Sequence, residues 1–291
     1  MSIFQDANRK QIANRRRVDW LLHILFVIAT SVGVLALCAL IIDVLVDGVA
    51  RLQPQLFTEF PSRKADGSGM KSALVGTVYM LLIMLPLSFV LGVGAAIYLE
   101  EYAGKNRLTR LIQLNISTLA GVPSIVYGIL GLTIFVRLMS LDRSLIAGAF
   151  TMTLLVLPII IVSAQEAIRA VPKSRRDASF ALGATKWQTV SRSVIPSSLA
   201  GILTGVILAM SRAIGETAPL VMIGALTYVA FLPNSLMDSF TVMPIQIYNW
   251  ISKPQLEFKE LAASGILVLL ALLLIMNFSA IMLRNKYQKN V

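Results

Sequence analysis

The sequence predicts an all-α integral membrane protein with six transmembrane helices, and two observations lead to this fold class. Hydrophobic residues make up 56% of the 291 residues, only 14% are charged, and the mean hydropathy is +0.76. Soluble domains carry about 25% charged residues. Four stretches contain no Asp, Glu, Lys or Arg: Trp20–Ile42, Ser72–Leu99, Leu111–Val136 and Ser144–Gln165. Each exceeds the ~20 residues that cross a ~30 Å hydrocarbon core as a helix.

The first apolar stretch follows five basic residues, as the apolar core of a signal peptide does. At 23 residues it is longer than such a core, which has ~7–15 residues, and further spans follow it. We therefore expect a retained helix at residues 20–46. A basic segment at 1–19 precedes it, and an external loop at 47–71 follows.

Five further helices are expected in a core at residues 72–284. Pro219 divides the apolar region around 195–232, because proline lacks a backbone donor and disfavours helix at the residue before it. The part after Pro219 is too short to cross, so 219–259 is expected to be external, with a re-entrant or surface segment. The expected spans are 72–99, 111–136, 144–166, 197–218 and 260–283. Pro123 predicts either a kink or a simple packing irregularity in the second of these.

The distribution of Lys and Arg predicts the orientation. One set of alternate connections holds 17 of these residues and the other holds 8. Since cytoplasmic connections are enriched in Lys and Arg, both termini, including the tail at 284–291, are expected in the cytoplasm. This distribution also accounts for the net charge of +11. Nucleic-acid binding is excluded because basic and aromatic residues do not interleave in any polar patch.

The expected cytoplasmic loop at residues 171–196 has signals for two short helices. Ser174 and Asp177 have the spacing of a capping box, and Gly183 is placed to end the first helix in a left-handed conformation. A second helix is expected at 186–194, ending at Pro196. The alternative is a solvated basic linker.

The loop also carries a family motif. Asp177-Ala178-Ser179, three residues, Gly183 and then Ile195-Pro196 resemble the EAA loop of ATP-binding-cassette importer permeases. The resemblance implies the type I importer permease fold, with the loop docked on a separate ATPase subunit. Asp177 in place of the leading Glu, and Ser193 in place of an aliphatic residue, depart from the pattern.

Further motifs between Ser68 and Arg284 resemble the A-type permease of the phosphate-specific transport system. They are SALVGT at 72–77, IYLEEY at 97–102, GVPSIVYG at 121–128 and SRAIGETAPL at 211–220. The resemblance implies a multi-pass, non-catalytic subunit of a bacterial inner-membrane phosphate importer. Its implied partners are a C-type permease subunit, two ATPase subunits and an external phosphate-binding protein.

Arg212 and Glu216 interrupt the fifth expected span at i,i+4 spacing, which places them on one helical face. A structural ion pair is one interpretation. The other is that Arg212 meets a transported oxyanion, since guanidinium stays charged and bonds two phosphate oxygens at once. The family resemblance favours this pathway role and places Thr217, in the same motif, at the same gate.

No cofactor, metal ligand set or catalytic group is expected in this chain. Gly67–Ser72 lacks the glycine that a Walker A loop needs before its lysine, so ATP is assigned to the partner ATPase. His23 is the single histidine and has no ligand cluster around it. Three alternatives remain: a permease for molybdate or sulfate, an ion-coupled secondary carrier, and a membrane scaffold or sensor.

Overall fold

A computed structural model describes residues 2–104, 106–225 and 228–288, and over these residues the chain is helical. Within this described part, the one β-type feature is an isolated antiparallel bridge between Ser144 and Ser239. The all-α prediction is confirmed. Positions 226–227 of the expected external region and 289–291 of the expected tail lie outside the described residues, as does Met1.

Five helical segments are long and apolar enough to cross a membrane, or six if one bent pair counts as a span. The five contain α1 (Ser2–Val49), α3 (Lys71–Ile97), α6 (Leu145–Arg169), α9 (Ile195–Ile214) and α12 (Leu256–Gln288). The bent pair joins α4 (Arg107–Leu119) to α5 (Ser124–Gly131) and the π-helical η2 (Leu132–Leu138). The predicted all-α membrane fold is confirmed, with five or six candidate spans against the six expected.

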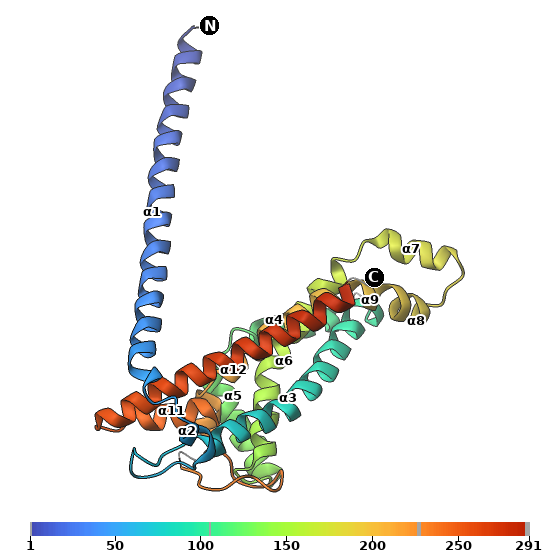
Figure 1. Cartoon of the computed structure of the whole chain (residues 1–291). Helices are drawn as coiled ribbons and strands as arrows, with labels where there is room; N and C mark the ends of the chain where they lie inside the picture. The colour runs from blue at the N-terminus through green and yellow to red at the C-terminus, as the bar shows by residue number, and fades with distance from the viewer. Residues whose placement is uncertain (1, 105, 226–227, 289–291) are drawn as a thin grey trace.

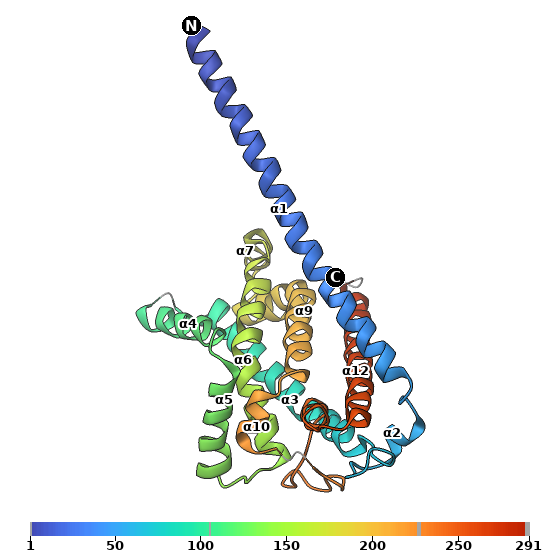
Figure 2. The same cartoon turned by 90° about the vertical axis from the view of Figure 1, so that its left-hand side faces the viewer.

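Helix α6 lies at the centre of the bundle, between α3, α5 and α9 (Figures 1 and 2). Small residues allow this close packing. A Cβ atom at Gly92 of α3 would lie 2.6 Å from Ile160 of α6, and one at Gly205 of α9 would lie 2.3 Å from Ser163. Small residues at helix contacts are typical of membrane bundles, where backbones must approach closely for van der Waals packing.

Helix α1 stands apart from the bundle and meets it only near the end of the helix (Figures 1 and 2). Ser264 of α12 donates a hydrogen bond of 2.7 Å to the carbonyl oxygen of Gly48. Beyond the helix, Arg51 pairs with Glu260 at 2.9 Å and with Asp66 at 3.2 Å, and these hydrogen bonds raise the pKa of Arg51. The most apolar stretch of α1 has no buried residue, so its surface is left to lipid or to a partner.

The third expected span is divided rather than continuous. Helix α4 ends at Leu119, α5 begins at Ser124, and the two axes differ by 107°. Pro123 provides the reason, because it occupies the N-cap position of α5 and disfavours helix at the residue before it. Helix α4 buries none of its residues and extends sideways from the bundle (Figure 2).

Pro196 does not end a helix, contrary to the prediction. The helix α8 (Lys186–Thr189) continues through the π-helical turn η3 (Val190–Val194) into α9, so residues 186–214 form one rod of 29 residues. Pro196 lies in the first turn of α9, directly after η3. The wider π-helical turn accommodates a residue that cannot donate a backbone hydrogen bond.

After the rod, the chain folds back into the bundle as short helices. Helix α9 ends at Ile214 with Gly215 as its C-cap, and α10 (Ala218–Ile223) begins with Pro219 in its first turn. Helix α10 packs against α5 with Leu220 and Ile223 buried. Further along, α11 (Met243–Ile251) packs on α12 and α3. The short α2 (Pro54–Thr58), from earlier in the chain, also contacts α3.

The contact between α5 and α10 has no room for an added methyl group at Gly128. A Cβ atom there would lie 2.8 Å from Pro219 Cα and 2.7 Å from Met222 Cβ. We predict that Gly128→Ala destabilises the chain by about 1–3 kcal/mol through overpacking. Thermal unfolding of the detergent-purified chain measures this. Gly94→Ala is the control, since a Cβ at Gly94 meets nothing within 4 Å. Equal melting temperatures for the two variants would contradict the packing of α10 on α5.

Candidate functional site

The predicted cytoplasmic loop is folded, which excludes the solvated-linker alternative. Its first helix, α7, spans Lys173–Ala181. The capping box predicted at Ser174 and Asp177 is wrong, because Pro172 occupies the N-cap position and Ser174 already lies inside the helix. Pro172 has an extended backbone, with φ −57° and ψ 140°, and α7 begins two residues earlier than the polar signal indicates.

Gly183 turns the chain between α7 and α8 with a φ of +81°, as its position predicts. A capping box does exist, at the start of α8, where Thr185 and Gln188 bond each other's backbone amides. The hydroxyls of Ser179 on α7 and Thr189 on α8 are 2.9 Å apart. These contacts hold the two short helices as one hairpin.

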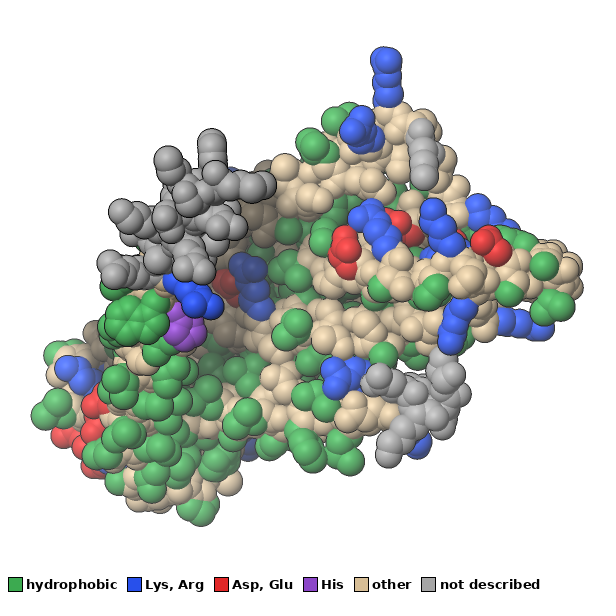
Figure 3. All heavy atoms as spheres, turned by 90° about the horizontal axis from the view of Figure 1, so that it is seen from above, with side chains coloured by type: hydrophobic (Ala, Val, Ile, Leu, Met, Phe, Trp, Pro, Cys, Tyr) green, Lys and Arg blue, Asp and Glu red, His purple; other side chains and the backbone are tan. Residues whose placement is uncertain are grey.

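The hairpin exposes part of the motif and three large apolar side chains, whereas Ser179, Ile195 and Pro196 are half-buried. Asp177 and Ala178 lie on the exposed face of α7. Phe180 is 47% exposed, Leu182 is 89% exposed and Trp187 is 66% exposed, and we call these three residues the loop patch. Lys and Arg side chains gather at this end of the molecule, with Asp and Glu side chains among them (Figure 3). An apolar patch inside a charged rim is typical of a protein-binding surface.

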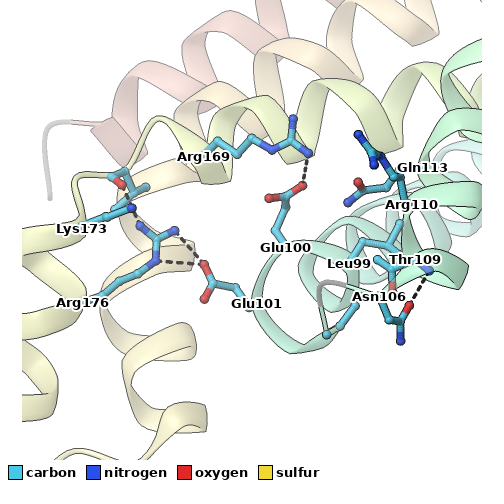
Figure 4. Close-up of a pocket in the computed structure, with 13 residues that line it drawn as sticks. Leu99, Glu100, Glu101, Asn106, Thr109, Arg110, Gln113, Arg169, Lys173 and Arg176 are labelled. Atoms are coloured by element: carbon cyan, nitrogen blue, oxygen red, sulfur yellow. Dashed lines mark hydrogen bonds and ion pairs between the residues drawn. The ribbon is translucent and has the colours of Figure 1, made fainter.

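Arg176 fastens the base of this hairpin to the bundle (Figure 4). Its guanidinium lies 2.7 Å from a carboxylate oxygen of Glu101. Glu101 belongs to the π-helical turn η1 (Tyr98–Tyr102), which directly follows α3. Arg176 also donates to the carbonyl oxygens of Val171 at 2.7 Å and Ile168 at 3.0 Å. The two charged side chains are only 19% and 11% exposed. This partly buried cluster connects α3, α6 and α7.

A second ion pair lies beside it, between Arg169 and Glu100 at 2.5 Å (Figure 4). Neither ion pair is predicted from residue spacing along the sequence. A signal was present, because two acidic residues directly follow a long apolar span and precede a basic segment. The pairing itself needs the packing of α3 against α6, which residue spacing does not reveal.

The ion pair predicted between Arg212 and Glu216 is present, with Nε and Oε1 3.5 Å apart. The side chain of Arg212 is 55% exposed and that of Glu216 is 20% exposed. Arg212 lies in the last turn of α9, whereas Glu216 lies just beyond the helix end. Thr217 is the N-cap residue of α10 but makes no side-chain capping bond. The three residues therefore lie together at the break between α9 and α10.

A neighbouring polar contact extends this region to α12. Ser211 donates to the side-chain oxygen of Asn277 at 2.6 Å. Asn277 was not predicted, although an amide in an otherwise apolar span is itself a signal of a polar contact or a cavity.

The motif residues of the predicted cytoplasmic loop and the residues of the α9–α10 break lie toward opposite ends of the rod. From Ile195 to Arg212 the separation is 17 residues, or ~26 Å along a helix axis. The hairpin residues and the α9–α10 break therefore cannot share one ligand, but the rod connects them rigidly. Within the described residues, no group of three or more His, Cys, Asp or Glu side chains could hold a metal ion.

The fold and these motifs agree with a comparison against protein families. The family of binding-protein-dependent transport system inner membrane components matches residues 88–289. The chain belongs to this family. The match includes the hairpin, the whole rod and the charged break.

Individual relatives and a solved structure point the same way. The chain is 31% identical over 276 residues to the phosphate transport system permease protein PstA of Yersinia pestis, covering 94% of this chain and 92% of that one. It is 36% identical over 214 residues to the probable ABC transporter permease protein YqgI of Bacillus subtilis (strain 168), covering 74% and 73%. A bacterial ABC transporter that imports the polysaccharide alginate has the same fold, with a TM-score of 0.65, 14% identity and coverage of 95% and 99%. The chain is thus a multi-pass ABC transporter permease.

We predict that the ion pair between Arg176 and Glu101 stabilises the attachment of the hairpin to the bundle. Glu101→Gln removes a partly buried charge and leaves Arg176 without its carboxylate. We expect this to destabilise the attachment of the hairpin to the bundle by about 1–3 kcal/mol. We expect faster hydrogen–deuterium exchange of the backbone amides in α7. Glu166→Gln is the matched control, because Glu166 also pairs with an arginine but its side chain is 66% exposed. Unchanged exchange in Glu101→Gln would show that the cluster does not anchor the hairpin.

Proposed function

We propose that this chain is the transmembrane permease subunit of an ATP-driven inorganic phosphate importer. It forms half of a translocation pathway that opens alternately to the two sides of the membrane. The names of relatives at about 30% identity, including the Yersinia pestis phosphate permease, support phosphate as the substrate class. The observation that carries the proposal is the half-exposed Arg212–Glu216 pair at the break between α9 and α10.

Arg212 has the chemistry that a transient phosphate site needs. Its guanidinium is permanently charged and presents a planar set of donors that matches two phosphate oxygens. Glu216 holds one edge of this group at 3.5 Å, while 55% of the arginine side chain remains exposed. The carboxylate weakens the attraction for a second anion, so phosphate binds and is also released. Thr217 lies beside the pair at the start of α10 and contributes to the same gate.

Coupling to ATP hydrolysis passes through the hairpin. An ATPase subunit binds the loop patch and the motif residues Asp177, Ala178 and Ser179. Closure of two ATPase subunits on ATP displaces α7 and α8. Because Ile195 and Pro196 lie inside the continuous rod, the displacement reaches Arg212 without a flexible joint. Catalysis and nucleotide binding stay with the ATPase, and this chain supplies no cofactor.

The proposed assembly contains a C-type permease subunit, two ATPase subunits and an external phosphate-binding protein. It resides in the bacterial inner membrane, with both termini of this chain in the cytoplasm. In the fold, the end of α12 and the hairpin lie at the same end of the bundle (Figure 1), as that orientation requires.

Labelled-phosphate uptake tests the role of Arg212 in cells that lack this chain and the other phosphate importers. Wild type restores uptake, and we expect Arg212→Gln to reduce it roughly ten- to a hundredfold, the loss of one charge-assisted contact. Arg212→Lys keeps the positive charge but lacks the planar pair of donors that bonds two phosphate oxygens, so it should retain intermediate uptake.

Arg137→Gln is the control for that series, since Arg137 is exposed at the end of η2 and should tolerate the change. Membrane levels of all variants are matched by immunoblot. Excess molybdate or sulfate should not compete with labelled phosphate. Normal phosphate uptake without this chain would refute phosphate import and leave the permease family intact.

Leu182→Ser tests the docking of the ATPase on the loop patch. Leu182 is 89% exposed, so the change leaves folding unaffected while removing an apolar contact. We expect clearly less ATPase to co-purify after mild solubilisation. Leu138→Ser is the matched control, because Leu138 is 79% exposed and lies at the end of η2. If the two variants retain equal amounts of ATPase, the hairpin is not the docking element.

A further inference from the structure

A second polar site lies at the base of the hairpin, away from Arg212. It is a pocket of 730 Å³ between the end of α3, the start of α4, the end of α6 and the start of α7. This volume falls within the range of pockets that hold small ligands, which is about 300–1,000 Å³. Figure 4 shows charged side chains entering the pocket from each of these elements.

The charges in the pocket do not balance. Four cationic side chains and two carboxylates line it: Arg110, Arg169, Lys173 and Arg176, with Glu100 and Glu101. Each carboxylate already pairs with one arginine, Glu100 with Arg169 and Glu101 with Arg176. Among the residues that the structure describes, Arg110 and Lys173 pair with no carboxylate. The pocket therefore carries two uncompensated positive charges.

These two cations come from separate walls. Arg110 projects from α4 together with Gln113, whereas Lys173 is the first residue of α7, beside Arg176 (Figure 4). The positive end of the α7 dipole adds to the charge of Lys173. Asn106 and Thr109 line the same wall as Arg110 and add polar groups. Two unpaired cations on separate walls of one pocket, with neutral polar groups beside one of them, suit an anion with several oxygens.

We propose that this pocket binds a phosphate group, held between Arg110 of α4 and Lys173 of α7. The phosphate could belong to the headgroup of an anionic phospholipid or be free inorganic phosphate. The surface of α4 favours the lipid, because Leu108, Leu111 and Leu114 are 65%, 57% and 60% exposed beside the pocket and can receive acyl chains. The bound phosphate bridges α4 to α7 and so tethers the base of the hairpin.

The test uses the full chain purified in detergent, with bound lipids counted by native mass spectrometry. Phosphatidylglycerol and phosphatidylcholine with identical acyl chains are offered in competition. We expect wild type to prefer phosphatidylglycerol. The double variant Arg110→Gln/Lys173→Gln should lose that preference by roughly tenfold or more, since it removes both charge-assisted contacts. Arg110→Lys/Lys173→Arg keeps both charges and should retain it, which separates lost binding from lost folding.

Two further arms identify the source of the phosphate and control for charge. Arg63→Gln/Lys64→Gln removes the same charge from two exposed residues of another loop and should change nothing. Displacement of phosphatidylglycerol by millimolar inorganic phosphate, absent in Arg110→Gln/Lys173→Gln, would assign the pocket to free phosphate. Equal lipid preference in the two glutamine variants would overturn the proposal. The measurement needs neither ATPase nor transport, so its result is independent of the proposed function.

Discussion

A backbone amide or carbonyl within a hydrocarbon layer has no water to bond, and the architecture of this chain depends on that constraint. It forces every span to be helical and confines irregular backbone to places where protein covers it. The two breaks, at Pro123 and Gly215, are partly exposed in this chain, so the rule predicts that a partner subunit or a water-filled cavity meets them. The helices that follow the two breaks, α5 and α10, pack against each other, with Gly128 against Pro219. Each break frees polar groups, and the second also carries the ion pair of Arg212.

The same constraint explains why the rod matters. An uninterrupted helix from Lys186 to Ile214 has its backbone bonds satisfied internally, so it can move as a rigid body without exposing polar groups. It approaches α6 closely where Gly205 meets Ser163, and larger side chains such as Ile202 and Met210 are buried beside this contact. The hairpin at one end and the charged break at the other are thereby parts of a single mechanical element, and Arg176 sets how tightly its base is held.

Much of this fold could be predicted from residue patterns, because uncharged runs of more than twenty residues admit few structures. The left-handed Gly183 and the pairing of Arg212 with Glu216 follow from local geometry and were also predictable. The capping box was misplaced and the helix end at Pro196 was wrong, because a preceding proline and a π-helical turn override the usual signals. Contacts between distant elements, such as Glu101 with Arg176, depend on how α3 and α6 pack, and spacing along one helix carries no information about that.

The isolation of α1 has a consequence for how the protein is made. Its contact in the finished fold joins Gly48 to Ser264, 216 residues later in the chain. At a synthesis rate of roughly 5–20 residues per second, α1 waits on the order of 10–40 s in the bilayer before α12 emerges. The apolar, unburied stretch of α1 from Val18 suits such a delay, because its contact with α12 can form only after α12 has been made.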